Sequence, residues 1–384
     1  MRIGIITCWW AKDNYGGILQ SYALQKYLRD QGHDAFVIRF LWGGDNRFIT
    51  KIKKVAKRVL YALSLYRSKS YGESIRAQKE VEEWNKIRNF DAFRKNNISV
   101  TQRLYKDITD LRKQPPLADA YITGSDQVWG VKLTEENHRI FYLDFGQTTI
   151  RRIAYAASFG QKQLPCADPT LFINLVKGFK AISVRETEGV EICKGCGIKA
   201  LQCVDSTLLL QAETYKALMS PRKNMAEYAY FYTVNVSSPD EIYWSEISNW
   251  LKENQIHTIV TTGSGYKRAK EMFEGATYDY STVEEWLANI YYSRYVITSS
   301  FHGIVFSILF QKDFIYIPLK SALSKGNDRI YDLLRHVNLE ERTAESFKDA
   351  QRILARSINY KTLVTRELLR LRDQSISFLE GALG

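Results

Sequence analysis

The sequence predicts an α/β protein made of two doubly wound parallel sheets. The chain has 384 residues, the length of about two domains at roughly 100 to 200 residues each. Apolar residues make up 45% of the chain, which is enough to give each domain a core. Strand-like runs alternate with helix-like segments through both halves, without a tandem repeat, and this alternation is typical of parallel sheets covered by helices.

The first half opens on an apolar run and continues as alternating strands and helices. Apolar residues at three- and four-residue spacing predict a helix over Ile18–Leu28 and a second, charged helix over Ile75–Phe93. The strands predicted in this half are Arg2–Thr7, Ala35–Ile38, Ala120–Thr123, Ile153–Ala156 and Ala181–Val184. We therefore expect a first Rossmann-like domain over residues 1–212.

The pattern restarts after the polar stretch Ser220–Asn224, which is the candidate linker. Helices are expected over Ile242–Leu251 and Val283–Tyr292 and directly after His302. The predicted strands are Tyr228–Val234, Thr258–Thr261, Tyr295–Thr298 and Phe314–Ile317. This half predicts a second Rossmann-like domain over residues 213–384, whose final helical segment, Tyr360–Leu379, packs back across the protein.

The charge of the chain indicates an anionic partner. Lys and Arg number 54 against 42 Asp and Glu, a net charge of +12, which suits nucleic acid, lipid head groups or phosphorylated small molecules. Between Lys51 and Lys69 there are seven cations and no carboxylate, with apolar residues at helical spacing. This basic amphipathic helix either lies on an anionic membrane surface or docks on its own domain. No nucleic-acid-binding module is recognisable, so nucleic acid is not an expected partner.

Several classes of protein are excluded by the same composition. No run of 18 apolar residues is present, so no membrane-spanning helix is expected. The apolar start is interrupted by Lys12-Asp13-Asn14 and predicts a first strand, not a signal peptide, which favours a cytoplasmic protein. The five cysteines are then expected to be reduced thiols. Cys193, Cys196 and Cys203 lack a clear fourth ligand, so no metal site is predicted.

Ligands of doubly wound sheets bind beyond the carboxyl ends of the strands. These positions carry Asp13–Gly17, Gly124–Gln127, Ser158–Gly160, Arg185-Glu186, Asp205-Ser206, Gly263–Gly265 and Ser299–Gly303. The pair Gly16-Gly17 at the start of a helix leaves free N–H groups that suit an anion. It is not the dinucleotide-binding G-x-G-x-x-G pattern, and no Walker A loop is present, so neither a nicotinamide or flavin site nor a P-loop is predicted.

Seven motifs, taken in order, resemble the polysaccharide pyruvyl transferase family. The matching pieces are Asn14–Gly17 with Leu19–Gln25, Gly124–Trp129, Ala154–Gly160, Ile182–Glu186, Val204–Leu209, Ser300–Gly303 and Asn327–Leu334. Two positions depart from the family pattern. Ser206 stands where the family usually has Pro, and Ser300 stands where some members carry Arg. An arginine that those members use near the His must therefore be replaced here or is not needed.

The resemblance implies transfer of a pyruvyl unit from phosphoenolpyruvate to two hydroxyls of a sugar, with release of phosphate. The acceptor would be a surface polysaccharide or its lipid-linked precursor, such as an undecaprenyl-linked oligosaccharide. No cofactor is implied beyond phosphoenolpyruvate as co-substrate. The resemblance also implies a GT-B-like arrangement, with a cleft between the two domains and the acceptor on the side of the first. The basic helix would place the protein peripherally on the inner face of the plasma membrane.

This chemistry needs a proton donor for the methylene carbon of the donor and a group that handles the acceptor hydroxyl. Of five histidines, only His302 follows a predicted strand and precedes a glycine that opens a helix. We expect His302 and Asp126 to be catalytic, and Arg185 to bind the phosphate or carboxylate of the donor. The other expected substrate-binding residues are Asn14, Tyr15, Gly16, Gly17, Ser125, Gln127, Ser300, Phe301, Lys325 and Arg329.

Plainer interpretations of the same residues stay open at this point. His302 could cap its helix, Arg185 could form an ordinary ion pair with Glu186, and Asp126 could stabilise a turn. Asp205 is more typical of a turn residue than of a substrate contact. Two other functions also fit the sequence, namely a glycosyltransferase that uses a nucleotide sugar and a noncatalytic binding protein of a surface-polysaccharide pathway.

Overall fold

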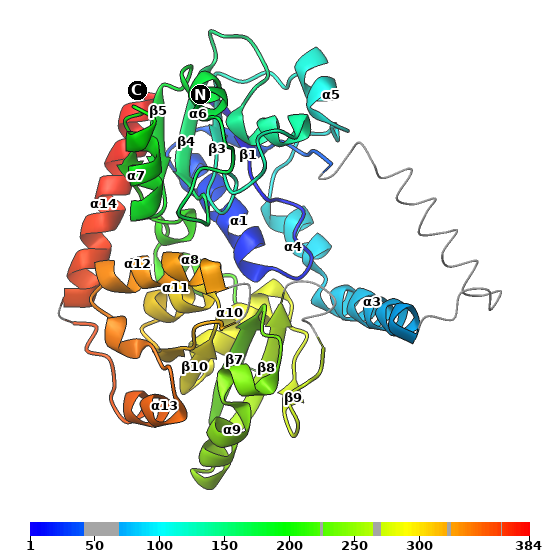
Figure 1. Cartoon of the computed structure of the whole chain (residues 1–384), viewed down its shortest axis with the longest axis vertical. Coiled ribbons are helices and arrows are strands. Elements are labelled where there is room, and N and C mark those ends of the chain that lie inside the picture. Colours follow the sequence, from blue (N-terminus) through cyan, green and yellow to red (C-terminus); the bar gives the residue numbers. More distant parts are fainter. Residues whose placement is uncertain (42–68, 223–225, 264–269, 321–323, 362) are drawn as a thin grey trace.

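Two parallel sheets form the frame of the molecule. The computed structural model describes residues 1–41, 69–222, 226–263, 270–320, 324–361 and 363–384. In Figure 1 the two sheets lie in the upper and lower parts of the molecule, with the helices packed around them. The sheet order in each part confirms the predicted class of two doubly wound α/β units.

The N-terminal sheet has six strands in the order β2-β1-β3-β4-β5-β6, all parallel. The strands are β1 (Arg2–Ile6), β2 (Asp34–Val37), β3 (Ala120–Thr123), β4 (Arg151–Ala157), β5 (Ala181–Val184) and β6 (Leu201–Gln202). The five predicted strands are confirmed. The edge strand β6 was missed because two paired residues give no periodic signal.

The C-terminal sheet has five parallel strands in the order β11-β10-β7-β8-β9. They are β7 (Tyr228–Val234), β8 (His257–Gly263), β9 (Thr277–Tyr278), β10 (Tyr295–Thr298) and β11 (Asp313–Tyr316). The four predicted strands are confirmed, and the short edge strand β9 was again missed. The tyrosines of β7 are buried, which explains why this strand has the unbroken apolar pattern of a sheet covered on both faces.

The helices largely follow the apolar spacing of the sequence. In the described residues they are α1 (Tyr15–Asp30), α3 (Lys69–Arg88), α4 (Phe90–Asn97), α5 (Ile108–Lys113), α6 (Pro169–Val176), α7 (Thr187–Gly195), α8 (Ala212–Lys216), α9 (Trp244–Glu253), α10 (Val283–Tyr292), α11 (Phe301–Leu309), α12 (Asp328–His336), α13 (Phe347–Leu354) and α14 (Leu363–Leu383). None of them is both long and apolar enough to cross a bilayer.

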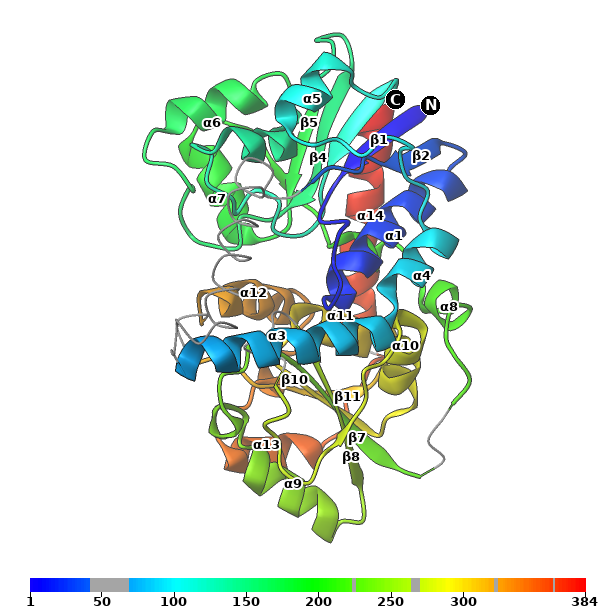
Figure 2. The same cartoon turned by 90° about the vertical axis from the view of Figure 1, so that its right-hand side faces the viewer.

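The single charged helix predicted over Ile75–Phe93 is wrong in one respect. Asn89 adopts a left-handed conformation, with φ of 46°, and divides the segment into α3 and α4. An asparagine tolerates this region better than most residues, so the break falls where the sequence permits it. Figure 2 shows α3 crossing toward the C-terminal sheet, where Trp84 stacks on Tyr280 at 4.8 Å between ring centroids.

One of the hydrophobic core clusters contains residues of both sheets. Tyr15 of α1 stacks on Trp286 of α10 with ring centroids 5.2 Å apart, and its hydroxyl donates to the carbonyl of Ser281 at 2.6 Å. The last helix, α14, runs back along the N-terminal sheet, so that the two chain ends lie close together (Figure 1). There Ser375 accepts a hydrogen bond from the backbone of Val204, and Arg372 donates to the carbonyl of Leu208.

Two sequence expectations remain without a structural test. The basic amphipathic helix from Lys51 to Lys69 lies outside the described residues, except for Lys69, which begins α3. The domain boundary between residues 212 and 213 stays a prediction, as does the linker at Ser220–Asn224, of which residues 223 and 224 are not described.

Candidate active site

The strand order places one strand-end loop of each sheet at the point where ligands of such folds bind. In the N-terminal sheet the order reverses between β1 and β3, and Ser125 and Asp126 follow β3 directly. In the C-terminal sheet it reverses between β7 and β10, and the turn after β10 leads to His302. Both loops follow the carboxyl ends of their strands, where a crevice forms between diverging connections. The two sheets therefore contribute one polar loop each to a common site.

Asp205, which follows β6, is the centre of a buried polar cluster. Its side chain is fully buried, and its Oδ2 atom accepts hydrogen bonds from Ser125 and from Nη1 of Arg185, both at 2.8 Å. Its Oδ1 atom accepts from the backbone and the hydroxyl of Thr207. Burial alone would raise the pKa of Asp205, but His302, Arg185 and these hydrogen bonds lower it below its ordinary value. Asp205 is therefore ionised within the protein.

Arg185 holds three carboxylates together at the end of β5. Its Nε atom donates to Glu186 at 2.8 Å, and its Nη1 atom lies 3.6 Å from Asp126 in addition to the contact with Asp205. Burial would lower the pKa of Arg185, but these carboxylates raise it. The Nη2 atom is buried and has no hydrogen-bond partner among the described residues. Arg185 is thus an ion-pair centre with one nitrogen, Nη2, that no described residue satisfies.

His302 reaches this cluster from the C-terminal sheet. Its Nε2 atom lies 3.6 Å from Oδ2 of Asp205 and has no hydrogen-bond partner in the described part of the chain. The ring packs directly on Gly16 of α1, where any added Cβ atom would overlap it at Nδ1. The helix cap of α11 is Ser300, whose hydroxyl accepts from the backbone of Gly303. The capping side chain is therefore that of Ser300 and not that of His302.

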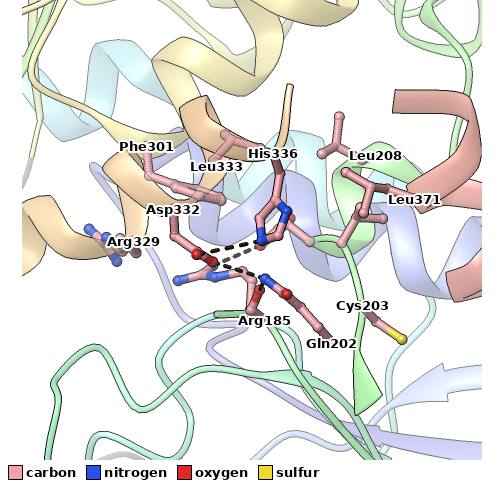
Figure 3. Close-up of a pocket in the computed structure, with 12 residues that line it drawn as sticks. Arg185, Gln202, Cys203, Leu208, Phe301, Arg329, Asp332, Leu333, His336 and Leu371 are labelled. Carbon is pink, nitrogen blue, oxygen red and sulfur yellow. Dashed lines mark hydrogen bonds and ion pairs between the residues drawn. The ribbon is translucent and has the colours of Figure 1, made fainter. Parts of the chain in front are cut away.

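Phe301 brings a second arginine to the site. The guanidinium carbon of Arg185 lies 4.4 Å from the centroid of the Phe301 ring, and that of Arg329, from α12, lies 5.8 Å from it. Both arginines line a small cavity of about 30 Å³ together with Asp332 and His336 of α12 (Figure 3). A cavity of this volume has room for one or two water molecules. Residues of both sheets meet around it.

Asp332 fastens α12 to the end of β5. Its carboxylate accepts from the backbone and the hydroxyl of Thr187, the first residue of α7, at 3.1 and 2.7 Å. It also accepts from Gln202 at 2.9 Å, and the same amide donates to the carbonyl of Arg185 (Figure 3). The neighbouring residue Glu186 makes no capping bond to α7, so Asp332 supplies the cap from another part of the chain.

The remaining predicted site residues divide into three groups. Asn14 caps α1 by accepting from the backbone of Gly17 at 3.0 Å, and Gly16 provides the surface for the His302 ring. Tyr15 is fully buried, and its hydroxyl bonds to Ser281, so its side chain lies in the shared core. Gln127 packs on Gly160, and Lys325 lies exposed just before α12. Their roles in binding stay predictions.

The structure also explains the Ser206 departure from the family pattern. Ser206 is fully buried, and its hydroxyl donates to the backbone carbonyl of Gln20 in α1 at 2.8 Å. Proline at this position would remove that hydroxyl, so Ser206 ties the Asp205 turn to α1 in a way that a proline cannot. The Asp205 turn and the helix under His302 are thereby held in one arrangement.

Sequence reasoning missed the importance of Asp205, Glu186 and Asp332. Each is a buried carboxylate that accepts a hydrogen bond from a residue at least 20 positions away in the sequence. The spacing of residues along the sequence does not reveal such a partner. The position of Asp205 after a strand was the available signal. Among the described residues no group of three or more His, Cys, Asp or Glu is placed to hold a metal ion, and all five cysteines are free.

The cluster contains the types of side chain that proton transfer and anion binding use. Within the described residues it combines an imidazole whose Nε2 atom has no hydrogen-bond partner, a carboxylate next to it, and two guanidinium groups that each have one nitrogen without a partner. The polysaccharide pyruvyl transferase family model matches residues 14–321, which include all these residues except Arg329 and Asp332. The chain belongs to the polysaccharide pyruvyl transferase family. The expected family is thereby confirmed, and the protein is a transferase whose family implies a polysaccharide substrate.

Comparison with other proteins adds distant structural likeness. No curated protein matches the sequence. UDP-GlcNAc 2-epimerase from Methanocaldococcus jannaschii is similar over 94% of this chain and 93% of its own, with 10% identity and a TM-score of 0.48. MurG from Acinetobacter baumannii is similar over 97% and 94%, with 10% identity and a TM-score of 0.41. The E. coli heptosyltransferase WaaC is similar over 82% and 88%, with 12% identity and a TM-score of 0.35.

The contact between Gly16 and His302 predicts that Gly16→Ala disturbs the site. The added methyl group would overlap the imidazole ring, so either the ring or α1 must shift, at a cost of roughly 1 to 3 kcal/mol in the free energy of unfolding. Urea denaturation measures this loss. Gly195→Ala is the matched control, because Gly195 ends a helix and has no atom within 4 Å of the added position. Equal stability of the two variants would contradict the tight contact.

Proposed function

We propose that the protein transfers a pyruvyl group from phosphoenolpyruvate to a sugar of a surface polysaccharide or its lipid-linked precursor, forming a cyclic ketal. The family assignment supports pyruvyl transfer. The observation that carries the proposal is the meeting of His302, from one sheet, with Asp205 and Arg185, from the other. A buried imidazole whose Nε2 has no hydrogen-bond partner in the described residues suits proton transfer in a site that excludes water.

In this proposal His302 begins the reaction. As an imidazolium it gives the Nε2 proton to the methylene carbon of phosphoenolpyruvate, and the electrons of the double bond form the new C–H bond. The central carbon then gains oxocarbenium character and becomes open to attack by a hydroxyl oxygen. The carboxylate of Asp205 lies 3.6 Å from Nε2 and holds the imidazole ring in position for this step.

Asp126 receives the acceptor hydroxyl. Its carboxylate lies at the edge of the cluster, 3.6 Å from Arg185, and it is the most exposed of the three carboxylates that Arg185 holds. The proton of the first sugar hydroxyl passes to Asp126 as the hydroxyl oxygen bonds to the central carbon. The C–O bond to phosphate then breaks, the second hydroxyl attacks the same carbon, and its proton leaves with the phosphate. The two new C–O bonds close the ketal.

The finer details of the acceptor rest on the sequence and the family. A lipid-linked acceptor and attachment to the inner face of the plasma membrane depend on the cations between Lys51 and Lys69, which lie outside the described residues. We also propose that residues in the loops after the strands surround the substrates. They are Asn14, Gly17, Ser125, Gln127 and Ser300.

The direct test of this function is mass spectrometry of candidate acceptors after incubation with phosphoenolpyruvate. We expect the acceptor to gain one pyruvyl unit minus water, with release of one phosphate for each ketal formed. Parallel reactions with nucleotide sugars test the glycosyltransferase alternative. Transfer of a whole sugar, or no change in any acceptor with phosphoenolpyruvate, would contradict the proposal.

The proton-transfer role of His302 predicts a large loss of turnover in His302→Gln. General acid–base catalysis contributes roughly 100- to 10,000-fold, so turnover should fall by at least about 100-fold at saturating donor. The melting temperature should change little, because Ser300 supplies the cap of α11. His257→Gln is the control, since His257 is exposed at the start of β8. A folded His302→Gln enzyme that keeps more than about a tenth of wild-type turnover would contradict this role.

A further inference from the structure

The positive charges of Arg185 and Arg329 are compensated very unequally. Arg185 contacts two carboxylates at 2.8 Å and a third at 3.6 Å, so its charge is already used inside the protein. Arg329 forms no ion pair with any carboxylate in the described part of the chain. Its Nε atom is shielded from solvent and has no hydrogen-bond partner there. Arg329 is therefore a cation at the site whose charge is not neutralised by the described residues.

The position of Arg329 makes this imbalance costly for the free protein. Burial lowers the pKa of Arg329, and the neighbouring charge of Arg185 lowers it further, against smaller opposite effects of Asp126 and Glu186. Both guanidinium groups are held over the ring of Phe301, at 4.4 and 5.8 Å, so two like charges approach the same apolar group (Figure 3). An anion that bonds to both arginines would offset this repulsion.

The unsatisfied N–H groups of the two arginines are a second, independent indication that an anion binds to both. Nη2 of Arg185 and Nε of Arg329 are both shielded from water, and both lack a partner among the residues that the structure describes. Buried donors without partners are uncommon in folded proteins and require an explanation such as an absent ligand. Here they belong to the two arginines that line one cavity between the sheets. An acceptor-rich anion that contacted both nitrogen atoms would satisfy them.

We propose that Arg329 is the residue that recognises the phosphate of the donor, and that Arg185 adds one N–H group while serving mainly to position the carboxylates. The inference rests on the proposed function and assigns the donor's phosphate to α12. A phosphate carries about two negative charges near neutral pH, and the three carboxylates of the cluster outnumber Arg185. The positive charge of Arg329, which no described carboxylate neutralises, offsets the repulsion between the phosphate dianion and these three carboxylates. It also remains available to the phosphate when that group leaves.

The experiment is calorimetric titration of the full-length protein with inorganic phosphate at low salt. Wild type should bind phosphate, and Arg329→Gln should weaken the binding by roughly tenfold or more, as expected for loss of a charge-assisted contact. Arg329→Lys keeps the charge but loses the planar fork, so its affinity should fall between the two. Because Arg329 holds no ion pair in the described residues, both variants should fold, and their melting temperatures check this.

The matched control is Arg335→Gln, which removes the same charge from an exposed position on the same helix. Its affinity for phosphate should stay within about twofold of wild type, since exposed charges act weakly at a distance. Unchanged phosphate binding in Arg329→Gln, an equal loss in Arg335→Gln, or no binding by wild type would overturn the proposal. Pyruvate, which has only the carboxylate, serves as a second probe. If Arg329→Gln weakens pyruvate binding and leaves phosphate binding intact, Arg329 holds the carboxylate and the proposal is wrong.

These titrations contain no acceptor, so they separate the two proposals. Phosphate binding that depends on Arg329, without ketal formation on any acceptor, would reject pyruvyl transfer and keep the phosphate site. Ketal formation without any effect of Arg329 on phosphate binding would reject the phosphate site at Arg329 and keep pyruvyl transfer.

Discussion

The arrangement of the site depends on one buried carboxylate, that of Asp205. A charge in the interior is tolerated only when it is paired and hydrogen-bonded, and Asp205 meets this condition through Arg185, Ser125 and Thr207. These partners come from the ends of β5 and β3 and from the turn that Asp205 begins. The remaining side of the carboxylate faces His302 from the other sheet. The carboxylate of Asp205 therefore holds the loops after β3, β5 and β6 in place relative to His302, which belongs to the other sheet.

Packing between the two sheets keeps Asp205 and His302 in this position relative to each other. Tyr15 and Trp286 stack in a core shared by both sheets, α14 returns to the N-terminal sheet, and Asp332 caps α7 from α12. Thirteen buried side-chain polar atoms lack a hydrogen-bond partner in the described part of the chain, and three of them belong to the site, namely Nη2 of Arg185, Nε of Arg329 and Nε2 of His302. The oxygens of Asp205 itself are all hydrogen-bonded, so the unsatisfied atoms mark where a ligand would complete the site.

Much of this could be predicted from the sequence, because strands, amphipathic helices and strand-end loops have local signatures. Nine strands and the loops that carry Asp126, Arg185 and His302 were found in this way. The two-residue strands β6 and β9 and the break at Asn89 were not, because they depend on pairing partners and on one backbone angle. Asp205 was taken for a turn residue. It does begin a turn, but its role arises from Arg185 and His302, which are 20 and 97 residues away in the sequence.

The central claim is that Asp205 acts on catalysis through His302. A double-mutant cycle tests it most directly, with turnover at saturating phosphoenolpyruvate measured for wild type, Asp205→Asn, His302→Gln and the double variant, each checked for folding by its melting temperature. Residues that act as a unit lose activity non-additively. We therefore predict that the double variant turns over within about twofold of His302→Gln alone. Multiplication of the two single losses in the double variant would show that Asp205 and His302 act independently, and would contradict the claim.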